Sequence, residues 1–177
     1  MRSDLTEVHA TLDSQISAFD LRTRTGFASF LRIQHGGLSA LHHAGAGDLT
    51  RDAIADLQDR ARLDLLTLGV PPLSHAETLP DDLHPLAVDY VIAGSRLGSQ
   101  LLHKRWLSSD DTAVRAASAY FSAPGHIDLW KAFCGRAAAL PAEGPESDRI
   151  LRHAAAVFAL FGHHAAAETQ ERALPHV

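Results

Sequence analysis

Apolar side chains recur every three or four residues along almost the whole chain, and this helical period restricts the fold more than any other feature. The period is plain at the beginning, where Leu5, Val8, Leu12, Ile16 and Phe19 follow one another. The alternation with a period of two that a half-buried strand requires does not extend over a useful length anywhere. The sequence therefore predicts an all-α fold.

Glycines and prolines divide the periodic pattern into roughly seven segments. Beyond the first segment, we expect helices at residues 23–44, from Asp48 or Thr50 to Leu68, at 85–105, at 110–121, after Gly125, and after the turn at 141–145. A chain of 177 residues fits one domain. We therefore expect a single-domain multi-helix bundle over residues 1–177.

The composition narrows the classes of partner and location. The net charge of -5 argues against nucleic acid as the main partner. The single cysteine, Cys134, excludes an intramolecular disulfide, and its neighbours favour a small core residue. No run approaches eighteen apolar residues, so we expect no membrane-spanning helix. The expectation that follows is a cytoplasmic protein.

His9 is the single polar residue on an apolar stripe of the first helix. Because positions 5, 9, 12 and 16 differ by four, three and four, Leu5, His9, Leu12 and Ile16 share one face. A neutral imidazole commonly binds iron or zinc, and haem often takes an axial histidine. The alternative is a partly buried histidine that is hydrogen-bonded to a backbone carbonyl. Arg2 precedes His9 by two turns, about 10 Å along the axis, and would suit a ligand that carries carboxylates.

Gly94 and Gly98 share a face of the expected helix at 85–105. Each glycine inside a helix costs about 1 kcal/mol relative to alanine, so something should offset the cost. One explanation is close packing against another helix, and the other is close approach to a planar ligand. Ser95 and Ser99 add hydroxyl groups that could order water there.

Two blocks of this sequence resemble the bacterial haem oxygenases, including those associated with bacteriophytochromes. Residues 1–13, MRSDLTEVHATLD, are similar to the family's Leu-Arg-x-x-Thr-x-x-x-His-x-x-Leu opening with the threonine shifted by one, and His9 falls on the proximal haem ligand. Residues 90–100 resemble the distal helix through the run Gly94-Ser-Arg-Leu-Gly98. Weaker similarity continues at Tyr120-Phe121, Trp130, Phe133 and Val157-Phe158.

The resemblance implies a bundle of the haem oxygenase type that cleaves haem to biliverdin and releases carbon monoxide and iron. Haem would be substrate and cofactor, and an external electron donor, such as a ferredoxin or a reductase, would supply electrons. His9 would hold the iron, and Gly94, Ser95 and Gly98 would form the distal side. The remaining haem contacts would come from Arg2, Tyr90 and Phe158. The cationic run at residues 103–105 would meet an acidic ferredoxin, or would complement a helix dipole.

The chain departs from the family pattern in ways that leave alternatives open. Ser95 stands where the animal enzymes carry an aspartate, and the propionate-binding lysines of other members have no obvious counterpart. One alternative is a non-catalytic haem carrier or sensor on the same fold. Another is a helical bundle with a di-metal carboxylate site. That site uses Glu-x-x-His pairs, and no such pair occurs in the sequence.

Overall fold

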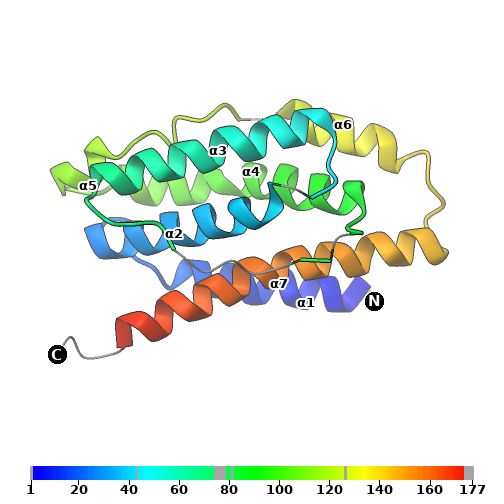
Figure 1. Cartoon of the computed structure of the whole chain (residues 1–177), viewed down its shortest axis with the longest axis horizontal. Coiled ribbons are helices and arrows are strands. Elements are labelled where there is room, and N and C mark those ends of the chain that lie inside the picture. The colour runs from blue at the N-terminus through cyan, green and yellow to red at the C-terminus, as the bar shows by residue number, and fades with distance from the viewer. Residues whose placement is uncertain (1, 43, 74–78, 81, 126, 174–177) are drawn as a thin grey trace.

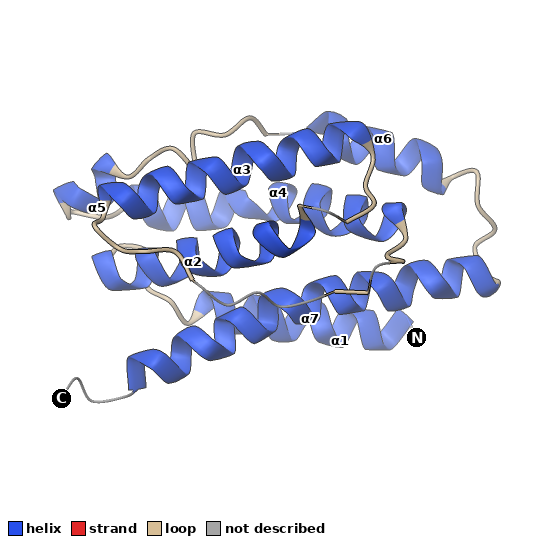
Figure 2. Ribbon diagram, viewed as in Figure 1, coloured by secondary structure: helices blue, strands red, loops and turns tan. Residues whose placement is uncertain are grey.

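The computed structural model of the chain describes residues 2–42, 44–73, 79–80, 82–125 and 127–173, with side chains from residue 5 onward. Every regular element in this part is an α-helix (Figure 2). The seven helices are α1 (Arg2–Ser17), α2 (Arg24–Leu41), α3 (Asp48–Thr67), α4 (Pro85–Leu107), α5 (Thr112–Ala116), α6 (Ile127–Ala137) and α7 (Pro145–Ala173). The all-α prediction is confirmed. None of the described helices is both long enough and apolar enough to cross a membrane.

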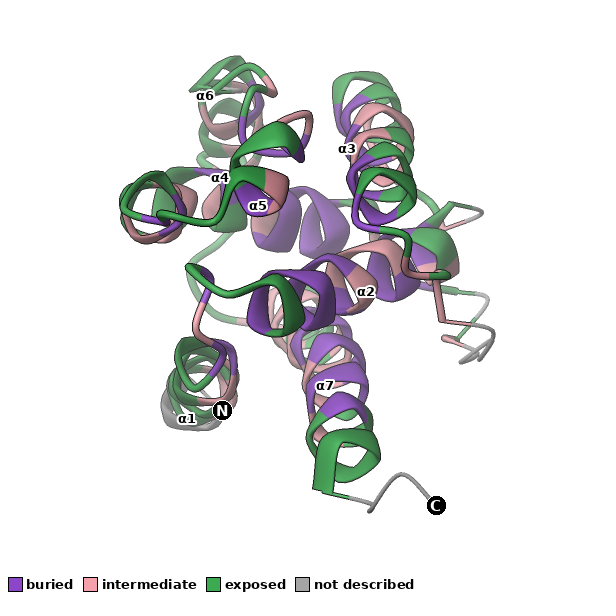
Figure 3. Ribbon diagram, turned by 90° about the vertical axis from the view of Figure 1, so that its left-hand side faces the viewer, coloured by how far each residue is buried: buried purple, intermediate pink, exposed green. Residues whose placement is uncertain are grey.

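α7 is the longest helix, and three other helices pack against it. It runs along the length of the molecule and contacts α1, α2 and α4 (Figure 1). α2 also packs on α3, and α4 packs on α6. The end view shows α2 in the interior between α3 and α7 (Figure 3). In the same view α1 and α4 lie on one side of the molecule, one below the other.

The helix boundaries follow local sequence signals where a side chain or a glycine can satisfy the terminal backbone groups. Thr23 caps α2 by accepting a hydrogen bond from the Gly26 N–H. His84 caps α4 in the same way, directly before Pro85. At the end of α3, Gly69 adopts a φ of 66°, and the Val70 N–H donates to the Leu65 carbonyl.

Two expected boundaries were wrong. Neither Asp48 nor Thr50 caps α3, because Gly47 occupies the N-cap and its N–H donates to the carboxylate of Asp89, 3.1 Å away. The helix expected at 110–121 is only α5, Thr112–Ala116. Asp111 caps its start. It ends where buried Asp64 accepts hydrogen bonds from the backbone N–H groups of residues 119 and 120, which draws that segment out of helical geometry.

Two adjacent glycines in α2 let α7 approach closely. A Cβ added at Gly37 would lie 2.3 Å from the Phe161 ring, and one at Gly36 would lie 3.0 Å from the His164 ring. A larger side chain at Gly37 would overlap with Phe161 of α7, and one at Gly36 would force the His164 ring to move by a few tenths of an ångström. The buried core between α2, α3, α4 and α7 therefore depends on a glycine pair in α2.

Candidate functional site

His9 lies on α1 with its side chain half exposed, at 51%. Its Nδ1 is 3.2 Å from the Asp13 carboxylate one turn later. The neighbours on its stripe are less exposed, since Leu5 and Leu12 are partly buried and Ile16 is buried. The alternative, a bond from His9 to a backbone carbonyl, is not present among the described hydrogen bonds, and the contact with Asp13 takes its place. Histidines that bind metals commonly direct one ring nitrogen at a carboxylate in this way and bind the metal through the other.

Phe158 of α7 joins the two helices that the sequence singled out. Its ring makes T-shaped contacts with His9, with 5.0 Å between ring centroids, and with Tyr90 of α4, at 6.2 Å. Phe158 is buried, with 5% of its surface exposed. Two of the predicted site residues, from α1 and α4, therefore contact a third, Phe158 of α7.

A small cavity of about 50 Å³ lies beside Phe158. Its wall includes Leu12 from α1, Ser95 from α4, and Tyr120. The Ser95 hydroxyl donates to the Ile92 carbonyl, 2.8 Å away. Sites for drug-sized ligands usually enclose about 300–1,000 Å³, so this cavity admits water or a diatomic gas. A ligand as large as haem does not fit in this cavity.

The two glycines of α4 do not serve helix packing. A Cβ added at Gly98 would meet nothing within 4 Å, and one at Gly94 would meet only Trp130, at an ordinary distance of 3.9 Å. This distinguishes them from Gly36 and Gly37 in α2. The packing explanation for the pair in α4 is therefore wrong, and bare backbone on an open face of the helix is what the glycines provide.

Tyr90 sits in an aromatic cluster at the start of α4. Its ring contacts Trp130 and Phe133 of α6, with centroid distances of 6.3 and 5.4 Å, in addition to Phe158. The cluster fixes the tyrosine ring against α6 and α7. The other expected propionate partner, Arg2, belongs to α1, but its side chain lies outside the described residues.

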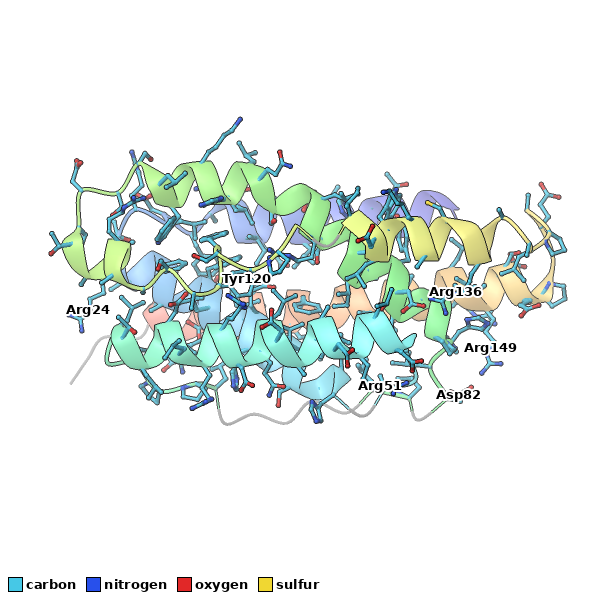
Figure 4. The ribbon with its side chains drawn as sticks, turned by 90° about the horizontal axis from the view of Figure 1, so that it is seen from above. Arg24, Arg51, Asp82, Tyr120, Arg136 and Arg149 are labelled. Carbon is cyan, nitrogen blue, oxygen red and sulfur yellow. The ribbon has the colours of Figure 1, made fainter. Side chains whose placement is uncertain are left out.

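Sequence reasoning did not reveal a group of contacting polar side chains that lies in the interior beside the cavity. Tyr120 is buried and donates to the side-chain oxygen of Gln34, 2.9 Å away. Figure 4 shows Tyr120 in the interior between α3 and α4. The guanidinium of Arg96 lies over its ring, 5.5 Å from the centroid. Burial raises the pKa of Tyr120, and the nearby charge of Arg96 opposes that rise. Arg96 stands between the two glycines, and no sequence signal marks it as buried.

One further expectation was wrong. Cys134 is exposed rather than in the core, because α6 turns mainly Leu129 inward. The cationic run at 103–105 lies in the last turn of α4, and two of its side chains are held against the fold. Arg105 donates to the carbonyls of Ser17 and Phe19 near the end of α1, and His103 stacks on Phe121. Among the described side chains, no group of three histidine, cysteine, aspartate or glutamate residues could hold a metal ion.

Comparisons with known proteins do not assign a family or a function to this site. No family model matches the chain, and neither do curated proteins or solved structures.

Proposed function

We propose that this protein is a haem oxygenase that binds haem between α1 and α4. The observation that carries the proposal is that the ring of Phe158 makes T-shaped contacts with both His9 of α1 and Tyr90 of α4. The open face at Gly98 supports it, because a large flat ligand can approach bare backbone there. The reaction would yield biliverdin, carbon monoxide and iron, with electrons from an external donor.

The residues present fit the demands of a haem site. His9 supplies an accessible imidazole, and Asp13 holds its Nδ1, which leaves Nε2 to bind iron. Leu12 offers apolar surface beside His9, and buried Phe158 packs behind the imidazole. The cavity at Ser95 provides a small volume on the α4 side. When bound, haem supplies the iron and the oxygen chemistry that opens its own macrocycle.

The protein itself would bind and orient haem, and it would order water beside the haem. The carboxylate of Asp13, 3.2 Å from Nδ1 of His9, would orient the imidazole. Gly94 and Gly98 remove side chains that would fill the space next to α4. The Ser95 hydroxyl donates to the Ile92 carbonyl, and its oxygen can still accept a hydrogen bond from water in the cavity.

Hemin titration tests the binding step. The parent protein should form a one-to-one complex with a sharp Soret band, and His9→Ala should lose the spectral signature of the axial imidazole. Asp13→Asn should weaken binding by about 10- to 100-fold, as expected for loss of an outer partner of a metal ligand. His163→Ala, which changes an exposed histidine of α7, is the matched control and should behave as the parent does. An unchanged spectrum and affinity in His9→Ala would refute the site.

Turnover distinguishes the enzyme from a haem carrier or sensor. With ascorbate or a ferredoxin system under oxygen, the Soret band should decay as biliverdin absorption appears. A haem complex that stays intact with several electron donors would show that the protein binds haem without cleaving it.

A further inference from the structure

Residues 82–84, directly before α4, are fastened to α7 by side chains of that helix. The Arg149 guanidinium donates to the Asp82 carbonyl at 2.8 Å and to its carboxylate at 3.0 Å, and Figure 4 shows the two residues side by side. One turn further along α7, Nδ1 of His153 accepts a hydrogen bond from the His84 backbone N–H, 2.9 Å away. We refer to these contacts between residues 82–84 and α7 as the α4–α7 joint.

The joint uses the imidazole of His153 as an acceptor. A neutral imidazole has one nitrogen that can accept a hydrogen bond, whereas a protonated imidazole carries a hydrogen on both nitrogens and can only donate. Uptake of a proton by His153 would therefore set two donors against each other, Nδ1–H of the ring and the His84 N–H. The hydrogen bond between α7 and the start of α4 exists only while His153 is neutral.

The surroundings of His153 favour the neutral ring. Partial burial lowers its pKa below the ordinary value of 6.5, and the Asp82 carboxylate opposes this effect. The positive charges of Arg149 and Arg152 lower the pKa of His153 further, as does His84. The closed joint then binds fewer protons than the open joint once the pH falls below 6.5. Acid therefore favours the open joint.

We propose that the α4–α7 joint is a pH switch, which opens when His153 takes up a proton and releases the start of α4. His84 is the second histidine of the joint, and its Nδ1 caps α4 by accepting from the Leu86 N–H at 3.2 Å. Its Nε2 lies 3.6 Å from the Glu146 carboxylate. A protonated His84 gains an ion pair there that partly offsets loss of the cap, so we assign the switch to His153. The inference does not rest on haem binding.

Amide hydrogen exchange of the apoprotein, followed by NMR from pH 7.5 to 5, tests the switch. The protection factor of the residue 84 amide, which corrects for the intrinsic pH dependence of exchange, should fall by up to about tenfold per pH unit below pH 6.5. The amide of Val157, in the buried part of α7, should stay protected. An equal fall at Val157 would show that acid unfolds the whole chain, and would overturn a local switch.

Matched histidine variants identify the residue that responds to the proton. His153→Asn replaces the ring with a side chain that does not titrate, so protection at residue 84 should no longer depend on pH. His84→Asn keeps a side chain that caps helices well, and its residue 84 amide should still lose protection in acid. His163→Asn changes an exposed histidine of α7 and should behave as the parent does.

Three results would each overturn the switch. The parent's residue 84 amide could keep its protection down to pH 5. His153→Asn could lose protection in acid as the parent does. His84→Asn could abolish the loss, which would assign the response to His84 instead. The parent and His84→Asn decide the question even if His153→Asn does not fold.

Discussion

At the scale of single residues, glycine has two opposite roles in this chain. Gly36 and Gly37 make room for the rings of His164 and Phe161, whereas Gly98 faces open space. The sequence shows two pairs of glycines inside helices and no sign of what each pair meets. The difference lies in α7, which begins more than a hundred residues after the first pair.

Alanine at the two kinds of position should move stability in opposite directions. Gly98→Ala gains about 1 kcal/mol of helix propensity without a clash, which should raise the melting temperature by about 2–4 °C for a chain of this size. Gly37→Ala drives a methyl group into the Phe161 ring. Overpacking costs about 1–3 kcal/mol and should lower the melting temperature. Calorimetry of both variants checks this, and equal shifts would contradict it.

Gly98→Ala also separates stability from chemistry. If haem lies against α4, the added methyl group takes space beside it, so turnover should fall although the protein is more stable. Single-turnover rates on the same preparation measure this. Normal turnover in the stabilised variant would place haem away from Gly98.

Glu168 should give stability a dependence on pH. Burial raises its pKa above 4.5, although Ser29 and Arg32 oppose the rise. The folded state then binds more protons than the unfolded state above pH 4.5, so stability falls as the pH rises through the raised pKa. Glu168→Gln should remove this loss of stability with rising pH. The melting temperature of the variant, relative to that of the parent, should therefore increase from pH 4.5 to 8. Glu171→Gln, at an exposed partner of the same Arg32, is the control.

At the scale of elements, the spacing of apolar residues and the positions of glycine and proline predicted six of the helices, and the bounds predicted for α2, α3 and α4 lie within about three residues of the observed ones. α5 was predicted too long, because the signal that ends it is the carboxylate of Asp64 in another helix. Cys134 was misplaced for a related reason, since α6 covers α4 with one narrow face. Local propensity does not contain contacts of this kind.

Asp89 shows how one carboxylate fixes three elements. From α4 it accepts from the Gly47 N–H at the start of α3 and from Arg136 of α6. Asp89→Ala leaves a buried N–H without an acceptor and should cost about 1–3 kcal/mol. Asp89→Asn keeps an acceptor, and Arg136, 44% exposed, can turn to water, so it should cost less than Asp89→Ala. Urea unfolding measures both, and equal losses would show that the charge, not the acceptor, matters.

At the scale of the whole molecule, the sequence predicted which residues to inspect but not how they meet. His9, Tyr90 and Phe158 were identified by spacing and resemblance, and the structure brings them together. The carboxylate of Asp13 could have been found from its spacing of four residues from His9. The burial of Arg96 could not have been found from the sequence, because residues 120–125, which lie in another part of the chain, cover it.

The position of α7 in the chain has a consequence for how the protein is made. α1, α2 and α4 all pack on a helix that is translated after them. Their apolar faces leave the ribosome before the surface that covers them exists, and contacts such as α1 with α7 span more than 120 residues. Pairings at such separation close late and slowly. Nascent chains that stop before α7 should therefore lack stable tertiary structure and depend on chaperones.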